Sequence, residues 1–228
     1  MSERSRVLER VDTPRGELVL RGDGEHLEVI SNGVFLMDTR DGASERLLVR
    51  AALERHPDPR VLLIGGLGVG FSLVQALADT RVERVVVVER EQTIVDWHRS
   101  WLAPWSAGAL DDPRTTVLVA DLVDLLDATT RPDDVGAMDV ACLDTDNGPD
   151  WLVSEGNAAL YSAEGLGRLH GLLAEGGLAA FWSANASPAF AVRLAEVFAD
   201  VETLSMASSN APRGEPDLVY LARRGERG

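Results

Sequence analysis

The sequence predicts an α/β protein in which a mostly parallel sheet is preceded by a small antiparallel β-meander. From residue 61 onward, short and continuous apolar runs alternate with helical stretches, which is the pattern of strands buried on both faces of a parallel sheet. Before residue 40, apolar and polar residues alternate in stretches that are separated by glycine turns. With 228 residues and 45% apolar content, the chain can bury one sizeable core and carry a small appendage.

The appendage is expected at the beginning of the chain. Turn signals at Gly22-Asp23-Gly24 and at Asn32-Gly33 divide residues 16–38 into three alternating stretches, which predicts a meander of antiparallel strands. Residues 43–55 carry apolar side chains on one helical face and end before Pro57. We therefore expect a helix there that leads into the main domain.

The main domain is expected at residues 57–228, after an N-terminal unit at residues 1–56. Its last two apolar runs are joined by a loop of Ser, Asn, Pro and Gly that leaves no room for a crossover helix, so they must pair antiparallel as a hairpin. A seven-stranded sheet that is parallel except for its last strand looks like the Rossmann-like sheet of the class I methyltransferases. The seven runs span residues 61–64, 85–88, 117–120, 140–143, 178–182, 201–206 and 218–222.

The charge of the chain excludes several classes of protein. It has 22 basic and 37 acidic side chains and a net charge of −15, which produces a field that repels phosphate backbones and anionic lipid headgroups. We therefore expect neither a nucleic acid nor a membrane as partner. All the basic residues are arginine, so the chain has no lysine for a phosphate-binding loop, a Schiff base or a kinase site.

Cysteine and histidine offer little chemistry. Cys142 is the single cysteine and lies inside a predicted strand, where a thiol acts as a small apolar side chain. One cysteine cannot form an internal disulfide framework, and no apolar leader follows the charged N-terminus, so we expect a cytoplasmic protein. The four histidines are not paired at a ligand spacing, and we predict no metal site.

A glycine-rich loop follows the first predicted strand of the main domain and precedes a helical stretch that begins at Phe71. Its glycines are Gly65, Gly66, Gly68 and Gly70. Glycine lets bare backbone approach a ligand at the start of a helix. A dinucleotide fingerprint would need a further glycine where Phe71 or Leu73 stands. The loop therefore favours a nucleoside over a dinucleotide, although close packing of strand and helix would also account for its glycines.

Four carboxylates follow predicted strands, and ligands of open α/β sheets bind beyond the carboxyl ends of the strands. Glu89 could accept hydrogen bonds from both ribose hydroxyls of a nucleoside, or it could be a solvated strand end. Asp121 could accept a hydrogen bond from an adenine amino group or cap the helix that follows it. Asp144 and Asp146 could hold a cationic amine or take a proton from one, or they could form an Asx-turn.

Two tryptophans lie where they could form walls of such a site. Trp151 follows the segment that contains Asp144 and Asp146, and Trp182 ends the fifth predicted strand of the main domain. Trp97, Trp101 and Trp105 are spaced four residues apart on one side of a predicted helix. Such a stripe is more often packed against a core than used to stack bases.

Together these residues resemble the spermidine synthases, the polyamine aminopropyltransferases. The resemblance extends over residues 16–206 and rests on the glycine-rich loop, Glu89, Asp121, the segment 144–149 and Tyr161. The turn at positions 32 and 33 also matches, with Asn-Gly where the family usually has Asp-Gly. The resemblance implies S-adenosylmethionine or decarboxylated S-adenosylmethionine as the cofactor.

The resemblance also implies a role for each carboxylate. Glu89 would bind the ribose, and Asp121 would lie near the adenine. Asp144 would deprotonate the attacking amine, and Asp146 would help to orient it. A small-molecule acceptor is the partner that this site implies, and a homodimer is a possible assembly.

Two features of the family's pattern are missing from this chain. The family's glycine-rich loop carries an aspartate that holds the aminopropyl ammonium of decarboxylated S-adenosylmethionine, and the nearest position here is Leu67. The family's Tyr-His-Glu stretch reads Ala43-Ser44-Glu45. A buried ammonium without its carboxylate is costly, so we expect methyl transfer from S-adenosylmethionine to a small acceptor. The alternatives are aminopropyl transfer to an amine and a non-catalytic nucleoside-binding protein.

Overall fold

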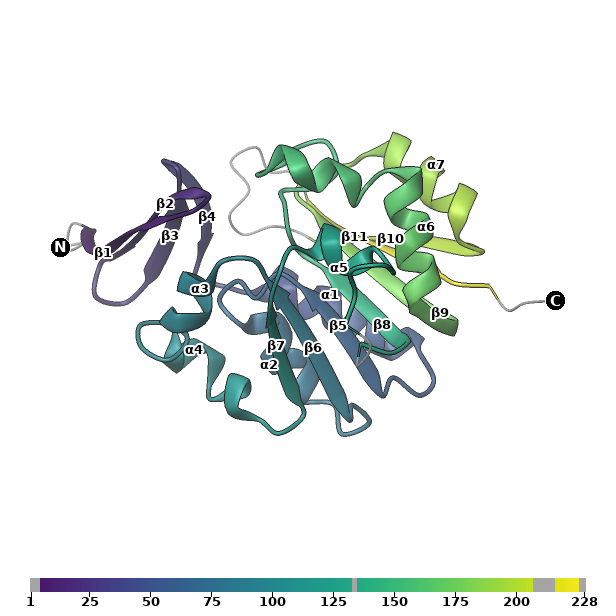
Figure 1. Ribbon diagram of the computed structural model, residues 1–228, viewed down its shortest axis with the longest axis horizontal. Helices are drawn as coiled ribbons and strands as arrows, with labels where there is room; N and C mark the ends of the chain where they lie inside the picture. The colour runs from purple at the N-terminus through teal and green to yellow at the C-terminus, as the bar shows by residue number, and fades with distance from the viewer. Residues whose placement is uncertain (1–4, 133–134, 207–215, 226–228) are drawn as a thin grey trace.

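The computed structural model describes residues 5–132, 135–206 and 216–225. The described chain forms two sheets (Figure 1). A four-stranded sheet comes from the N-terminal part of the chain, and a seven-stranded sheet with helices on both faces comes from the rest. The sequence predicted an N-terminal meander and a mostly parallel sheet, and the structure confirms both.

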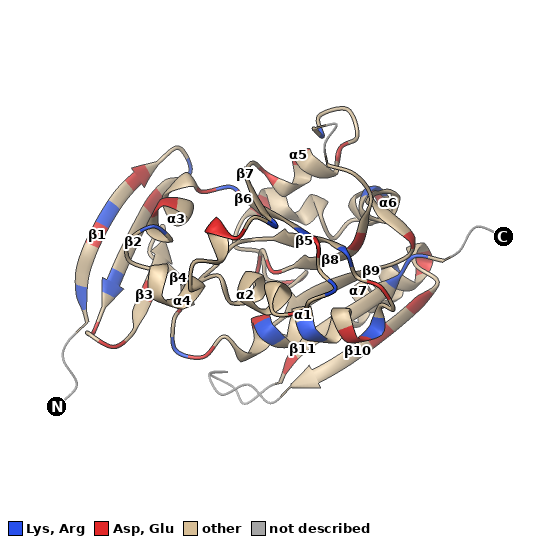
Figure 2. Cartoon of the chain, turned by 90° about the horizontal axis from the view of Figure 1, so that it is seen from below, with Lys and Arg blue, Asp and Glu red and all other residues tan. Residues whose placement is uncertain are grey.

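The smaller sheet is an antiparallel meander with the strand order β1-β2-β3-β4. Its strands are β1 (Arg6–Thr13), β2 (Gly16–Gly22), β3 (Leu27–Ser31) and β4 (Val34–Asp38). The last three strands confirm the predicted meander, whereas β1 is an additional strand that the sequence analysis missed. Charged side chains interrupt β1 (Figure 2), and none of its residues is buried. Its alternation of apolar and polar residues is therefore weak.

The larger sheet has the strand order β10-β11-β9-β8-β5-β6-β7. β11 pairs antiparallel with both β9 and β10, and the other pairs in this sheet are parallel. This confirms the Rossmann-like sheet of the class I methyltransferases, with seven strands of which the last is antiparallel. The strands are β5 (Val61–Gly65), β6 (Arg84–Glu89), β7 (Thr115–Val119), β8 (Met138–Leu143), β9 (Leu173–Ser183), β10 (Asp200–Met206) and β11 (Asp217–Arg223).

Helices cover both faces of the larger sheet (Figure 1). One face carries α1 (Ala43–Arg55), α2 (Phe71–Leu77) and α3 (Gln92–Trp97), and the other carries α5 (Leu122–Leu126), α6 (Ala163–Leu172) and α7 (Pro188–Val197). Single turns span α4 (Ala103–Ser106) and the 3-10 segments Ala109–Asp111 and Glu155–Ala159. The helix predicted over residues 43–55 is confirmed by α1.

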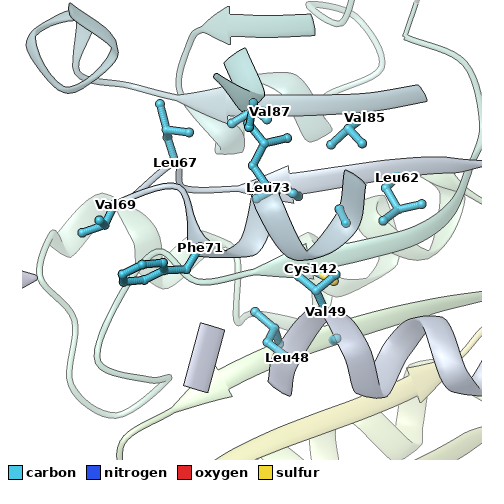
Figure 3. Close-up of a cluster of buried hydrophobic side chains, with 14 of the residues drawn as sticks. Leu48, Val49, Leu62, Leu67, Val69, Phe71, Leu73, Val85, Val87 and Cys142 are labelled. Atoms are coloured by element: carbon cyan, nitrogen blue, oxygen red, sulfur yellow. The ribbon is translucent and has the colours of Figure 1, made fainter. Parts of the chain in front are cut away.

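Each central strand contributes side chains to two hydrophobic clusters, one on each face of the sheet. In β5, Leu62 and Ile64 belong to the cluster beneath α1 and α2, whereas Leu63 belongs to the cluster beneath α5, α6 and α7. Figure 3 shows part of the first cluster, in which Cys142 of β8 lies near Leu48 and Val49 of α1. Leu62 and Val85 belong to the same cluster. Burial on both faces is the reason why these strands appear in the sequence as continuous apolar runs.

The meander is joined to the larger sheet by hydrogen bonds. The indole nitrogen of Trp101 donates to the carboxylate of Glu9 in β1 over 2.7 Å, and the guanidinium of Arg15 donates to the carbonyl of Arg90 over 2.9 Å. The tryptophans at positions 97 and 101 therefore have different roles. Trp97 is buried in the core, but Trp101 is 40% exposed and connects the two sheets. The division of the chain between residues 56 and 57 stays a prediction.

The structure also bears on membrane, metal and thiol chemistry. None of the described helices combines the length and the apolar content of a membrane span. Within the described ranges, His, Cys, Asp and Glu side chains do not gather in a group of three that could hold a metal ion. Burial, followed by the nearby charge of Asp144, raises the pKa of the Cys142 thiol to about 12. This thiol is therefore unreactive near neutral pH.

Two glycines of α6 provide a test of the packing. At Gly165, a Cβ atom would lie 1.9 Å from the carbonyl oxygen of Ala159, whereas at Gly167 no atom lies within 4 Å. We expect Gly165→Ala to lower the free energy of unfolding by about 1–3 kcal/mol, because the helix must shift to admit the methyl group. Gly167→Ala is the matched control and should raise it by about 0.5–1 kcal/mol, since alanine favours a helix over glycine. Equilibrium denaturation in urea measures both, and equal effects would contradict the described contact.

Candidate functional site

A cavity of about 1130 Å³ lies at the carboxyl edge of the parallel strands. The segments that follow β5, β6, β7 and β8 all reach it, as expected for an open α/β sheet. Trp151 and Trp182 line it, as the sequence analysis suggested. Six of the eight predicted site residues also line it: Gly66, Gly68, Glu89, Asp121, Asp144 and Asp146.

Gly65 and Gly70 lie outside the cavity, and their contacts explain them as packing residues. A Cβ atom at Gly65 would lie 2.6 Å from a methyl group of Leu122. Gly70 precedes α2 with a φ angle of 95°, and a Cβ atom there would lie 3.0 Å from the imidazole of His98. The packing explanation that the sequence left open thus accounts for these two glycines. Their predicted contact with a ligand stays a prediction.

Gly66 brings the glycine-rich loop against the end of β8. Its φ angle is 91°, in the left-handed region that glycine adopts without strain. A Cβ atom at this position would lie 2.4 Å from the carbonyl oxygen of Asp144. The backbone of Asp144 also donates a hydrogen bond to the carbonyl of Gly65 over 2.9 Å. The loop and the segment after β8 are therefore held together through their backbones.

Glu89 holds the start of the glycine-rich loop. One of its carboxylate oxygens accepts a hydrogen bond from the backbone of Leu67 over 3.0 Å, and the other accepts one from Glu91 over 2.8 Å. Burial raises the pKa of Glu89, and the two backbone donors oppose that shift. Each carboxylate oxygen has a second acceptor position, so Glu89 can still accept a ribose hydroxyl from the cavity side. Its ribose-binding role stays a prediction.

Asp121 caps the helix that follows β7. Its side chain accepts a hydrogen bond from the backbone of Val123 over 2.9 Å at the start of α5. This is the capping role that the sequence analysis left open beside the adenine-binding role. Because Asp121 also lines the cavity, one carboxylate oxygen can cap the helix while the other is turned to a ligand. The contact with adenine stays a prediction.

Asp144 lies partly buried in the cavity, beyond the end of β8. Burial raises the pKa of Asp144 to about 8, and the negative charges of Glu45, Asp217 and Asp146 add to the shift. A carboxyl group with such a pKa is poised to exchange a proton near neutral pH. Asp217 was missed by the sequence analysis, since it is the first residue of β11 and only the position of β11 beside β9 brings it to this edge.

Two hydrogen bonds hold the carboxylate of Asp146 in place. One carboxylate oxygen accepts a hydrogen bond from the backbone of Val153 over 2.7 Å, and the other accepts one from the hydroxyl of Tyr161 over 3.2 Å. Only 5% of Asp146 is exposed. This geometry fits a residue that shapes the segment from Asp144 to Val153 better than one that grips a substrate. The predicted role of Asp146 in orienting an amine remains untested.

The sequence pointed to Leu67 as the place of the carboxylate that the glycine-rich loop lacks, but the structure favours Gly68. Leu67 is 2% exposed and packs in the hydrophobic cluster with Leu73 and Val87 (Figure 3), so an aspartate there would be buried among apolar side chains. A Cβ atom at Gly68 would instead have its nearest neighbour at 3.7 Å, in the thioether sulfur of Met37. Leu67, Gly68 and Met37 all line the cavity, but of the two loop positions Gly68 is the one with open space for a side chain. The loop position that could present a carboxylate to a ligand is therefore Gly68.

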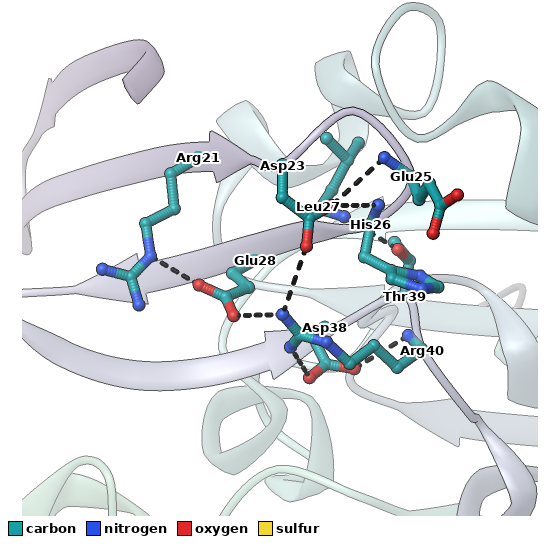
Figure 4. A network of polar contacts seen from close by, with 9 residues as sticks. All are labelled: Arg21, Asp23, Glu25, His26, Leu27, Glu28, Asp38, Thr39 and Arg40. Atoms are coloured by element: carbon teal, nitrogen blue, oxygen red, sulfur yellow. Dashed lines mark hydrogen bonds and ion pairs between the residues drawn. The ribbon is translucent and has the colours of Figure 1, made fainter. Parts of the chain in front are cut away.

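The cavity is strongly acidic. Its two arginines are Arg40 and Arg90. Arg40 is already paired, because its guanidinium lies 2.6 Å from Glu28 and 2.6 Å from Asp38 (Figure 4). Such a lining attracts cations and repels anions. The eight carboxylates that line the cavity are Asp38, Asp41, Glu45, Glu89, Asp121, Asp144, Asp146 and Asp217.

Comparison with known proteins places this chain in a family. The spermine/spermidine synthase domain matches residues 42–188. The chain belongs to the spermine/spermidine synthase family. This confirms the resemblance inferred from the glycine-rich loop and the carboxylates. The matched segment begins just before α1 and ends in α7, so it includes Glu45 and Asp144 but not Asp217.

Individual members of the spermine/spermidine synthase family are similar over different shares of the chain. Polyamine aminopropyltransferase 1 of Hyperthermus butylicus is 29% identical over 90% of this chain and 68% of its own length. Polyamine aminopropyltransferase 2 of Pseudomonas aeruginosa is 34% identical over 67% of this chain, which corresponds to 41% of its own length. The crystal structure of spermidine synthase from Thermotoga maritima superposes with a TM-score of 0.78 at 18% identity, covering 97% of this chain and 74% of that one. This last likeness establishes the fold.

The raised pKa of Asp144 predicts how stability changes with pH. Because the folded-state pKa of about 8 lies above the value of about 3.9 in an unfolded chain, the folded protein binds this proton more tightly between these pH values. The stability that Asp144 contributes is therefore greatest below pH 4 and falls as the pH rises toward 8. Asp144→Asn removes the titration. The free energy of unfolding of the variant minus that of the parent should therefore be about 2 kcal/mol larger at pH 8 than at pH 6.

Urea denaturation of the parent and variant at the two pH values measures this difference. Asp150→Asn is the matched control for the change from Asp to Asn, since Asp150 is exposed in the same segment. A gain for Asp144→Asn that is the same at pH 6 and pH 8 would contradict a raised pKa.

Proposed function

We propose that this chain is an aminopropyltransferase that moves the aminopropyl group of decarboxylated S-adenosylmethionine to an amine. The observation that carries the proposal is the acidic lining of the cavity. The donor is a sulfonium with an ammonium and no carboxylate, and the acceptor is also cationic, so both suit such a lining. The names of the curated relatives, which are polyamine aminopropyltransferases, support the same reaction. A spermidine synthase of similar fold has been solved with the transition-state analogue AdoDATO.

The donor nucleoside would occupy the part of the cavity formed by β5, β6 and β7. Glu89, already fixed by two backbone donors, would accept hydrogen bonds from the ribose hydroxyls. Asp121 would accept one from the adenine amino group with the oxygen that does not cap α5. The glycine-rich loop would allow close approach to the sulfur side of the nucleoside, since Gly66 and Gly68 have no side chain.

The acceptor amine would occupy the part of the cavity between Asp144, Glu45 and Asp217. An ammonium that enters there is stabilised by these carboxylates, and its charge favours the ionised form of Asp144. Asp144 then takes a proton from the ammonium, and the freed nitrogen attacks the aminopropyl carbon that is bonded to sulfur. The new carbon–nitrogen bond replaces the carbon–sulfur bond, whose electron pair stays on the sulfur of methylthioadenosine. Asp144 returns its proton to solvent.

Methyl transfer, the function expected from the sequence, is the second candidate. One observation favours it, because Gly68 leaves the loop without a carboxylate to hold the ammonium of the decarboxylated donor. The carboxylate of S-adenosylmethionine, however, would enter a cavity lined by eight carboxylates and two arginines. The charge balance and the named relatives both support aminopropyl transfer better.

The product of the reaction decides between the two transfers. We expect mass spectrometry to show an added aminopropyl group when the protein is incubated with decarboxylated S-adenosylmethionine and a library of amines. An added methyl group from S-adenosylmethionine would instead support the second candidate. If neither product forms with any acceptor, a non-catalytic nucleoside-binding protein becomes the better explanation.

Asp144→Asn tests the proposed base. It keeps the shape of the side chain but removes its ability to take a proton, so turnover should fall by roughly 10²-fold or more, the scale for losing a positioned base. The affinity for methylthioadenosine, measured by calorimetric titration, should stay within about twofold, because Asp144 is not placed on the nucleoside. Asp150→Asn is the matched control and should leave turnover unchanged. A variant with full turnover would remove Asp144 from the chemistry.

Gly68→Asp tests the missing carboxylate of the glycine-rich loop. Gly68 has a φ angle of 54°, a conformation that aspartate tolerates better than most residues. The new carboxylate should strengthen binding of decarboxylated S-adenosylmethionine by about tenfold, since an ammonium gains a charge-assisted partner, while methylthioadenosine, which has no ammonium, should not gain. Leu67→Asp is the comparison variant and should destabilise the fold instead. Equal gains for both ligands would contradict a direct contact with the ammonium.

A further inference from the structure

A buried histidine lies beneath the glycine-rich loop. His98 follows α3 directly and is 5% exposed. Its Nε2 atom lies 3.0 Å from the carbonyl oxygen of Gly68. Because a carbonyl oxygen can only accept a hydrogen bond, Nε2 must carry the proton. The other ring nitrogen, Nδ1, is buried and has no hydrogen-bond partner within the described ranges.

The surroundings of His98 keep its ring neutral and fixed in place. Burial lowers the pKa of His98, so the ring stays neutral at physiological pH. The ring is also confined, since a Cβ atom at Gly70 would lie 3.0 Å from its Cε1 atom. His98 is therefore a fixed donor to a single carbonyl of the loop.

The bond from His98 sets the direction of the next backbone amide. The Gly68–Val69 peptide is trans, like the other described peptide bonds, so the N–H of Val69 points opposite to the carbonyl of Gly68. His98 lies on one side of this peptide. Gly68 and Val69 both line the cavity, whereas His98 does not. The N–H of Val69 is consequently directed away from His98, toward the cavity.

That N–H is an unusual group. Val69 is 3% exposed, and its backbone N–H donates no hydrogen bond to any part of the chain that the structure describes. Buried backbone donors are nearly always paired. The neighbouring N–H of Leu67 is paired, with Glu89 over 3.0 Å. Two side chains of the β6–α3 unit, Glu89 and His98, thus hold two peptides of the loop. Among the described residues, the N–H groups of Gly68 and Val69 are left without a partner in the chain, and the N–H of Val69 belongs to the peptide that His98 holds.

We propose that His98 is a positioning residue that orients the Gly68–Val69 peptide, so that the N–H of Val69 donates a hydrogen bond to the bound nucleoside. The proposal rests on the nucleoside site of the proposed function but not on which group is transferred. Without the imidazole, this peptide loses its anchor and can rotate. Nucleoside affinity should then fall about five- to tenfold, the range for one lost hydrogen bond.

Three variants at position 98 separate orientation from packing. The amide nitrogen of His98→Gln can take the place of Nε2, that of His98→Asn takes the place of Nδ1, and His98→Leu has no donor. Calorimetric titration with methylthioadenosine should show about five- to tenfold weaker binding for the Leu and Asn variants, with the Gln variant within about twofold of the parent. His170→Leu, which changes a histidine of α6, is the control and should bind as the parent does.

Two further measurements test the role of His98, one on the amide of Val69 and one on turnover. In the ¹⁵N-labelled protein, the Val69 amide resonance should move downfield when methylthioadenosine is added to the parent and to His98→Gln, but not to His98→Leu. In turnover, His98→Leu should raise KM for the nucleoside donor and leave kcat and the KM of the amine unchanged.

The outcomes separate this inference from the proposed function. Equal weakening in the Gln and Leu variants, or no response of the Val69 amide in the parent, would overturn the role of His98. Binding of methylthioadenosine to the parent without transfer to any amine would overturn the proposed reaction alone. Failure of the parent to bind methylthioadenosine would overturn both.

Discussion

The backbone contact between Gly66 and Asp144 fixes the relation between the glycine-rich loop and the proposed base. A side chain at position 66 would collide with the carbonyl oxygen of Asp144, at 2.4 Å from its Cβ atom. β5 and β8 are paired directly up to Gly65 and Leu143, so both segments leave the sheet side by side. The proposed nucleoside and acceptor sites are therefore joined through two directly paired strands. Their spacing does not depend on a flexible side chain.

Electrostatics gives the site its chemistry at a cost to stability. Asp144, Glu45 and Asp217 raise one another's energy when no cation is present, and this repulsion adds to the burial that raises the pKa of Asp144. Buried like charges are tolerated in folded proteins mainly where function uses them. Hydrophobic burial on both faces of the sheet offsets this cost. An entering ammonium relieves the repulsion, so the same carboxylates that destabilise the empty cavity favour the filled one.

The sequence predicted the features that depend on local pattern. Continuous apolar runs identified the strands of the larger sheet, and the missing crossover identified β11 as antiparallel. Features that depend on the surroundings of a side chain in the folded protein were missed. The sequence pointed to Leu67 for the absent carboxylate, but Leu67 packs in the hydrophobic cluster although it lines the cavity, whereas Gly68 has open space for a side chain. Asp217 carried no local signal, because only strand order brings the start of β11 to the cavity.

The interior position of β11 has a consequence for biosynthesis. β11 lies between β9 and β10, so residues 217–223 must be inserted between two strands that are made earlier. While the ribosome is still producing this segment, the long strand β9 has an open edge beside it, and open edges recruit other chains. The sheet and the acidic cavity wall are completed by the same strand. A nascent chain therefore completes the lining of the cavity only at the step that also closes the open edge of β9.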